Sequence, residues 1–226
     1  MLNGKKILLI IGGGIAAFKC HDLIRGLREA GASVIPVLTE AGKEFVTPLS
    51  ISVLSGSKVY SDLFDLEDET QMGHIELSRN SDLIVIVPAT ADLLAKMASG
   101  LANDLASTLL LATDTDVLAA PAMNVRMWEH LATRRNIQLL KKDGIGFIGP
   151  VEGSMACGEF GFGRMAEPEQ IIAAIKKKLS PGKLKGKHIV VTSGPTHEQI
   201  DPVRFIGNLS SGTQGTQIAV ALLNEG

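Results

Sequence analysis

The sequence predicts an α/β protein built on a central parallel sheet, and three observations favour this fold class. Short apolar runs at 6–11, 33–38, 83–87 and 117–120 alternate with segments of helical composition. The run at 83–87 is apolar at five consecutive positions and mostly β-branched, which is typical of a strand buried on both faces. Glycines at 12–14 follow the first run directly, where a strand must turn tightly into a helix.

Composition limits the classes of partner. A formal net charge of -2 over 226 residues argues against nucleic acid or an anionic membrane as the main partner. The hydrophobic content of 45% and mean hydropathy of +0.22 suit a sheet covered on two faces and an oligomer interface. No apolar run approaches the roughly 20 residues of a membrane span, so a cytoplasmic protein is expected. The two cysteines, Cys20 and Cys157, cannot form a disulfide framework, and no Cys or His spacing matches a zinc site, so no metal is predicted.

The first turn has the pattern of a phosphate-binding loop. Gly12, Gly13 and Gly14 precede a helix expected from Ile15 to Ala30. The pattern is not the full dinucleotide fingerprint, because the glycines are consecutive, and a plain tight turn is the alternative. Thr39 ends the second strand and is either a helix cap or a second phosphate contact.

Two later strand ends carry the same arrangement of residues. VPATAD at 87–92 and APAMN at 120–124 each place a proline, an alanine and a polar side chain after an apolar run. Because proline cannot extend a hydrogen-bonded ladder, each strand is expected to stop there. On adjacent strands the two loops would line one pocket, with a helix N-terminus that favours an anionic group. An ordinary strand–loop–helix joint is the alternative for the first loop, and a plain helix cap is the alternative for Asn124.

Two further segments contain candidate catalytic residues. The acidic stretch at 60–73 is predicted to be a solvated loop, and it leads to His74 and Arg79 on a short amphipathic turn. A lone histidine is more often structural than catalytic, and the place of His74 just before a central strand narrows this preference without reversing it. The stretch Glu152–Met165 holds four glycines and Cys157, which predicts a mobile lid and favours a reactive cysteine. Cys20 lies on an apolar helix face, which favours a core role.

A domain boundary is expected after the helix at 169–179. SPGKLKGK at 180–187 is rich in Pro, Gly and Lys, and a new strand is predicted from His188 to Thr192, with a final helix after it. A single βα unit of this size cannot bury its own faces, so the second domain is expected to be incomplete.

Five motifs in order resemble the homo-oligomeric flavin-containing cysteine decarboxylase family, in particular its phosphopantothenoylcysteine decarboxylases: GGGIAAFK, GHIELSR, VPATADLLAK, APAMN and ACGEFGFGRM. The resemblance covers residues 1–180 and implies a three-layer α/β/α Rossmann-like flavoprotein fold. After a linker at 181–187, residues 188–226 resemble the opening of phosphopantothenate–cysteine ligases, the start of a second α/β domain.

The resemblance implies an activity. The first domain would decarboxylate 4'-phosphopantothenoylcysteine to 4'-phosphopantetheine in coenzyme A biosynthesis, with FMN transiently oxidising the thiol-bearing carbon. A full-length protein would also ligate cysteine to 4'-phosphopantothenate with CTP and Mg2+. No ligase activity is expected from this chain. The family forms homo-oligomers based on trimers, including dodecamers.

The resemblance also assigns residues. His74 matches the catalytic base, Cys157 the proton donor and Asn124 the group that holds the substrate carboxylate. The matches to cofactor-binding positions are Gly13, Gly14, Ile15, Thr39, Pro88, Ala89 and Thr90. Further substrate-binding matches are Arg79, Ala122, Met123 and, in the ligase-like segment, Asn208. The chain departs from the family pattern at Asp92, Leu93, Thr213 and Gln214.

Three other functions remain open. A non-catalytic flavoprotein that regulates a protein phosphatase is disfavoured because His74, Asn124 and Cys157 are all present. A nicotinamide-dependent dehydrogenase is supported only by the first turn. A flavin prenyltransferase of similar fold would not call for a lid cysteine.

Overall fold

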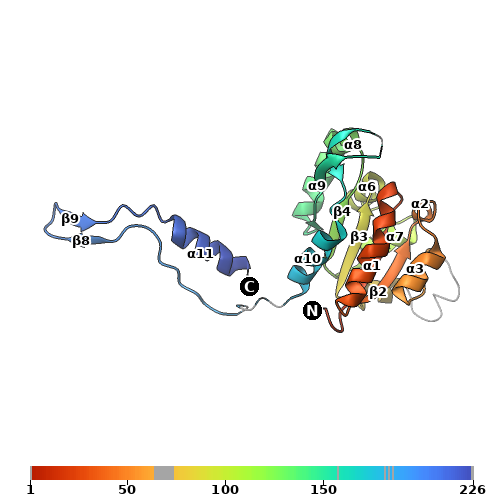
Figure 1. Ribbon diagram of the computed structural model, residues 1–226, viewed down its shortest axis with the longest axis horizontal. Coiled ribbons are helices and arrows are strands. Elements are labelled where there is room, and N and C mark those ends of the chain that lie inside the picture. The colour runs from red at the N-terminus through yellow and green to blue at the C-terminus, as the bar shows by residue number, and fades with distance from the viewer. Residues whose placement is uncertain are drawn as a thin grey trace. The chain divides into compact units, whose positions relative to one another are not determined.

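The computed structural model describes residues 2–63, 74–156, 158–180, 182, 184 and 186–224, shown in Figure 1. At His74, Ile75 and Asn224 only the backbone is described. The chain divides into two compact units, Met1–Leu179 and Ser180–Gly226.

The first unit is built on a five-stranded sheet in which every neighbouring pair is parallel. The strand order is β2-β1-β3-β4-β5, which confirms the predicted central parallel sheet. The strands are β1 Lys6–Ile11, β2 Ser33–Leu38, β3 Leu83–Ala89, β4 Val117–Pro121 and β5 Gly146–Phe147.

Helices cover both faces of the sheet and make three layers (Figure 1). Successive side chains of a strand point to opposite faces. Ile7, Leu9 and Ile11 of β1 therefore pack with α1, α3 and α10. Leu8 and Ile10 pack on the other face with α5, α6, α7 and α9. All five side chains are completely buried. The helices are α1 Cys20–Glu29, α2 Glu40–Lys43, α3 Pro48–Ser55, α5 His74–Arg79, α6 Ala91–Ser99, α7 Leu105–Ala112, α8 Val125–Glu129, α9 Leu131–Lys142 and α10 Pro168–Leu179.

The helix expected from Ile15 begins as a 3-10 helix, η1 Ile15–Lys19, and becomes α-helical only at Cys20. The N–H of Ala17 donates to the carbonyl of Gly14 at 2.9 Å, a bond across three residues that winds the first turn more tightly.

The prediction that Pro88 stops its strand is wrong, because β3 continues through the proline to Ala89, whereas β4 ends at Pro121 as predicted. The β3–β4 register shifts between Ile86 and Ala89, and Ala89 then pairs with Pro121. Such an irregularity lets the ladder pass a residue that lacks an N–H. The two strand ends are therefore held side by side.

The stretch predicted to be a mobile lid is an antiparallel hairpin, with strands β6 Val151–Ser154 and β7 Phe160–Arg164. The hydrogen-bonded ladder between the two strands gives this glycine-rich stretch a regular backbone structure. Cys157 lies between the two strands in sequence and is outside the described residues, as are 64–73 of the predicted acidic loop.

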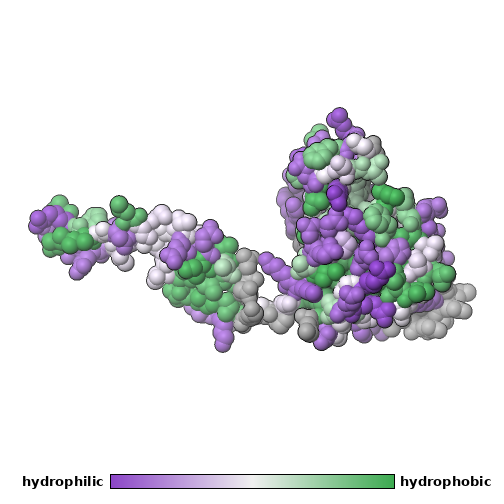
Figure 2. Space-filling model, viewed as in Figure 1, coloured by the Kyte–Doolittle hydropathy of each residue, from purple (hydrophilic) through white to green (hydrophobic). Residues whose placement is uncertain are grey.

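The second unit contains a hairpin, β8 His197–Gln199 with β9 Phe205–Gly207, and a helix, α11 Thr213–Asn224. The predicted strand at His188–Thr192 is not formed, and the strands described in this unit, β8 and β9, pair only with each other. Apolar side chains of α11 are exposed, and Figure 2 shows the hydrophobic surface they make. None of the described residues of this unit is a buried hydrophobic residue.

Candidate functional site

A cavity of about 680 Å³ lies at the carboxyl ends of the strands in the first unit. Four segments line it: the first turn and η1 at 13–19, the β3–α6 junction at 90–91, the loop after β4 at 122–127, and both strands of the β6–β7 hairpin. The lining is mainly apolar, with a few polar groups, which is the usual character of a small-molecule site.

The strand order explains why a cavity forms at this point. After β1 the chain crosses to β2 on one side, whereas β3, β4 and β5 lie on the other side. In open α/β sheets, ligands bind outside the strand ends where the winding direction changes. Here that point lies between β1 and β3, and the loops after both strands line the cavity.

The glycines of the first turn allow close packing. A Cβ on Gly12 would lie 2.4 Å from the Pro88 carbonyl oxygen, and one on Gly13 would lie 2.4 Å from the Cβ of Ala41. At Gly14 the nearest atom would be Pro88 Cγ, at 3.9 Å, an ordinary contact. The first two glycines therefore bring the turn against neighbouring backbone, and the backbone at 13–15 is presented to the cavity.

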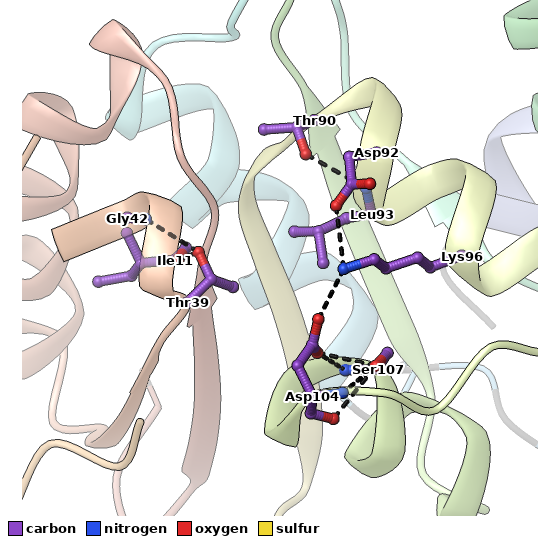
Figure 3. A network of polar contacts seen from close by, with 9 residues as sticks. All are labelled: Ile11, Thr39, Gly42, Thr90, Asp92, Leu93, Lys96, Asp104 and Ser107. Atoms are coloured by element: carbon purple, nitrogen blue, oxygen red, sulfur yellow. Dashed lines mark hydrogen bonds and ion pairs between the residues drawn. The ribbon is translucent and has the colours of Figure 1, made fainter. Parts of the chain in front are cut away.

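Thr90 begins α6 at the cavity wall (Figure 3). Its hydroxyl accepts a hydrogen bond from the Leu93 N–H at 3.2 Å, which is an N-cap contact. Behind this turn, Lys96 joins Asp92 at 3.2 Å and Asp104, the N-cap of α7, at 2.7 Å. The N-terminus of α6, which is the positive end of its helix dipole, therefore faces the cavity. The ion pair between Lys96 and Asp104 holds this helix to α7.

Asn124 begins α8 and also lines the cavity. Its Oδ1 accepts from the Met127 N–H at 2.8 Å. Its Nδ2 donates to none of the residues that the structure describes, so both N–H groups of the amide remain for a ligand. The predicted helix cap and a role in binding are therefore compatible.

The hairpin is joined closely to the loop that carries Asn124. The Met123 N–H donates to the Gly163 carbonyl at 3.0 Å. Gly163 has a φ of +143°, and a Cβ there would lie 2.3 Å from the Met123 carbonyl oxygen. Glycine at this position lets the hairpin wall approach the loop.

Residues 1–180 match the family model described as Flavoprotein. The chain belongs to the flavoprotein family. Residues 184–226 of this flavoprotein match the model described as DNA/pantothenate metabolism flavoprotein C-terminal domain.

Individual relatives agree with this family. The coenzyme A biosynthesis bifunctional protein CoaBC of Vibrio vulnificus strain YJ016 is 51% identical over 225 residues, which are 100% of this chain and 56% of that protein. The chain therefore spans little more than half the length of this curated relative. A solved PPC decarboxylase mutant complexed with pantothenoylaminoethenethiol is 34% identical, with a TM-score of 0.68, over 76% of this chain and 96% of that one. The FMN binding protein AtHal3 is 32% identical, with a TM-score of 0.68, over 77% and 96%.

In this flavoprotein the structure brings together seven of the predicted site residues. All seven line the cavity: Gly13, Gly14, Ile15, Thr90, Ala122, Met123 and Asn124. Pro88 and Ala89 are buried in β3 behind the lining. The hydroxyl of Thr39 caps α2 and donates to the Ile11 carbonyl at 3.0 Å, and the residue does not line the cavity.

The remaining predicted residues lie elsewhere or outside the description. Arg79 is exposed at the end of α5 and does not line the cavity, while His74 begins the same helix with its side chain undescribed. Asn208 belongs to the second unit, where its amide donates to the Thr196 hydroxyl at 2.9 Å. The predicted core role of Cys20 is confirmed: it is completely buried, and burial raises the pKa of its thiol to about 12.

Sequence reasoning missed two charged residues of the lining, Lys19 and Arg164. The Glu167 carboxylate bridges them, with Oε2 2.8 Å from Lys19 Nζ and Oε1 2.6 Å from Arg164 Nη2. The hydrogen bond from Lys19 is the main reason that the pKa of Glu167 is held below its usual value. Lys19 follows Ile15 by four residues, a helical spacing that could have indicated a shared face.

Neither a metal site nor a membrane-spanning helix is found among the described residues. Within that part of the chain, no group of three or more His, Cys, Asp or Glu side chains is arranged to hold a metal. The helices in the same part are all too short or too polar to cross a bilayer.

Proposed function

We propose that this flavoprotein holds FMN in the switch-point cavity and decarboxylates 4'-phosphopantothenoylcysteine to 4'-phosphopantetheine, a step of coenzyme A biosynthesis. The observation that carries the proposal is that the glycine turn, the Thr90 cap and Asn124 line one cavity. The names of the relatives, a coenzyme A biosynthesis protein and a PPC decarboxylase, support the choice of substrate.

The residues present fit FMN. A cavity of about 680 Å³ with a mainly apolar lining suits a flat aromatic ring system. The backbone at 13–15 and the N-terminal turn of α6 offer N–H groups to the cofactor, and Pro88 and Ala89 support these segments from behind. Thr39 would position the end of β1 through its hydrogen bond to Ile11. When bound, FMN supplies the reversible two-electron acceptor that a cysteine carboxylate lacks.

Asn124 would hold the substrate carboxylate. Its Oδ1 is committed to capping α8, whereas its Nδ2 can donate into the cavity. A neutral donor suits a carboxylate that must lose its charge, because an arginine would stabilise the ground state more than the transition state.

Two proton-transfer roles complete the proposal. His74 would act as the base toward the substrate thiol, and Cys157 would return a proton to the product carbon. The hairpin that flanks Cys157 would exclude water, since Met155 and Met165 give it an apolar inner wall.

The wider assignments are part of the same proposal. The longer protein would also join cysteine to 4'-phosphopantothenate with CTP and Mg2+, because residues 184–226 match a C-terminal domain of pantothenate metabolism. A cytoplasmic homo-oligomer is proposed: Ile15 and Phe18 line the cavity yet are 62% and 55% exposed, and a second copy could cover them.

The test is CO2 release by the purified yellow protein supplied with 4'-phosphopantothenoylcysteine. Wild type should release CO2 and form 4'-phosphopantetheine. Cys157→Ser should still release CO2 but accumulate the enethiol, which is not reduced to 4'-phosphopantetheine. A chain that holds flavin without releasing CO2 would favour a regulatory flavoprotein, and a chain that holds no flavin would refute the proposal.

A further inference from the structure

Three charged side chains meet at one side of the cavity, and we call them the rim cluster: Lys19 of η1, Arg164 at the end of β7, and Glu167 just before α10. Each carboxylate oxygen of Glu167 is engaged by a different cation. The backbone of Glu167 is also fixed, because its N–H donates to Gln170 Oε1 at 2.9 Å.

The rim cluster carries an excess of positive charge. It has two cations and one carboxylate, and among the described residues that line the cavity Lys19 and Arg164 are charged while none is acidic. The Lys19 side chain is only 14% exposed, so its charge is weakly screened by water. An anion that enters the cavity would meet both donors.

We propose that the rim cluster is a phosphate subsite, in which Glu167 occupies the two cations until the phosphate monoester of a bound ligand replaces it. The inference rests on the proposed function, since both FMN and the proposed substrate carry such a group. A phosphate monoester has a charge of about -1.5 to -2 near neutral pH and three terminal oxygens. It can therefore accept from Lys19 and Arg164 at once and compete with a single carboxylate.

A purely structural role makes a different prediction. If the rim cluster only ties η1 to the base of the hairpin, removing either Lys19 or Glu167 breaks the same ion pair and weakens ligand binding in the same way. If it is a phosphate subsite, Lys19→Met removes a donor, whereas Glu167→Gln removes the competitor. The two variants then have opposite effects.

The experiment measures dissociation constants of two matched ligand pairs by calorimetry. The apoprotein is titrated with FMN and with riboflavin, and the FMN-loaded protein with 4'-phosphopantetheine and with pantetheine. The ratio of the two dissociation constants within each pair measures the contribution of the phosphate alone. The pair whose ratio changes in the variants identifies which phosphate the rim cluster binds. The proteins are wild type, Lys19→Met, Lys19→Arg, Glu167→Gln and, as a matched control, Arg25→Met, which breaks the exposed Arg25–Asp22 pair on α1.

For one of the two pairs, Lys19→Met should reduce the phosphate preference by about 10- to 100-fold, and Lys19→Arg should restore most of it. Glu167→Gln should raise the same preference by roughly three- to tenfold. Arg25→Met should leave both ratios unchanged. Equal losses in Lys19→Met and Glu167→Gln, unchanged ratios in both, or a wild type that does not prefer phosphorylated ligands would each overturn the inference. Loss of CO2 release with these ratios as expected would count against the proposed reaction alone.

Discussion

Gly163 joins the hairpin to the Asn124 loop, and Gly163→Ala tests that joint. At its φ of +143° an alanine is strained, and the added Cβ would lie 2.3 Å from the Met123 carbonyl oxygen and 2.9 Å from Met155 Cε. The methionine side chain can move aside. The carbonyl cannot retreat without breaking the hydrogen bond from the Met123 N–H to Gly163.

The expected cost has two parts. The strained backbone contributes about 1–3 kcal/mol, and the lost hydrogen bond contributes about 0.5–1.5 kcal/mol. We therefore expect the free energy of unfolding to fall by roughly 2–4 kcal/mol. Because the hairpin wall would move away from the cavity, ligand binding should also weaken by about tenfold or more.

Urea unfolding and flavin titration measure the two effects. Gly144→Ala is the matched control: its φ is +91°, and an added Cβ meets nothing within 4 Å. It should lose only about 1–2 kcal/mol from backbone strain and bind flavin normally. If Gly163→Ala matches Gly144→Ala in both stability and binding, the hairpin is not held through this contact and the reasoning is wrong.

Three further predictions follow from the site. Asn124→Asp should change the free energy of unfolding by no more than about 0.5 kcal/mol, because aspartate caps a helix as well as asparagine does. It should weaken substrate binding by charge repulsion while FMN stays bound. Loss of flavin instead would mark a structural role for Asn124. Lys96→Met should lower the free energy of unfolding by about 1–2 kcal/mol, since it leaves Asp92 and Asp104 without their cation. Lys43→Met is the control: it breaks the Lys43–Glu40 pair, in which the Glu40 side chain is 76% exposed, and should cost less. The pKa of Glu167 is lower in the folded state than in the unfolded state, so its carboxylate stabilises the fold at pH values above the unfolded pKa, and this stabilisation is lost as pH falls through the folded pKa. The difference in melting temperature between wild type and Glu167→Gln should therefore shrink on acidification. A constant difference would contradict the assigned ion pairs.

Much of the fold follows from local pattern. The strands at 6–11 and 33–38 have the predicted bounds, because short apolar β-branched runs bounded by Gly and Thr have few alternatives. The hairpin at 151–164 was missed, because its glycines dilute the alternation that predicts strands. The strand expected at His188–Thr192 was wrong for the opposite reason: its apolar run is clear, but a strand also needs a neighbour to pair with.

The sequence alone determined the parallel sheet, the glycine turn and the identity of the residues at two strand ends, since each depends on a short stretch of chain. Only the tertiary structure decided that Ala89 pairs with Pro121, so that both strand ends open into one cavity. It also placed Lys19 beside Glu167, 148 residues along the chain, and left Thr39 and Arg79 outside the lining. Contacts between distant residues depend on how helices pack across the sheet, and spacing along the sequence carries little information about that packing.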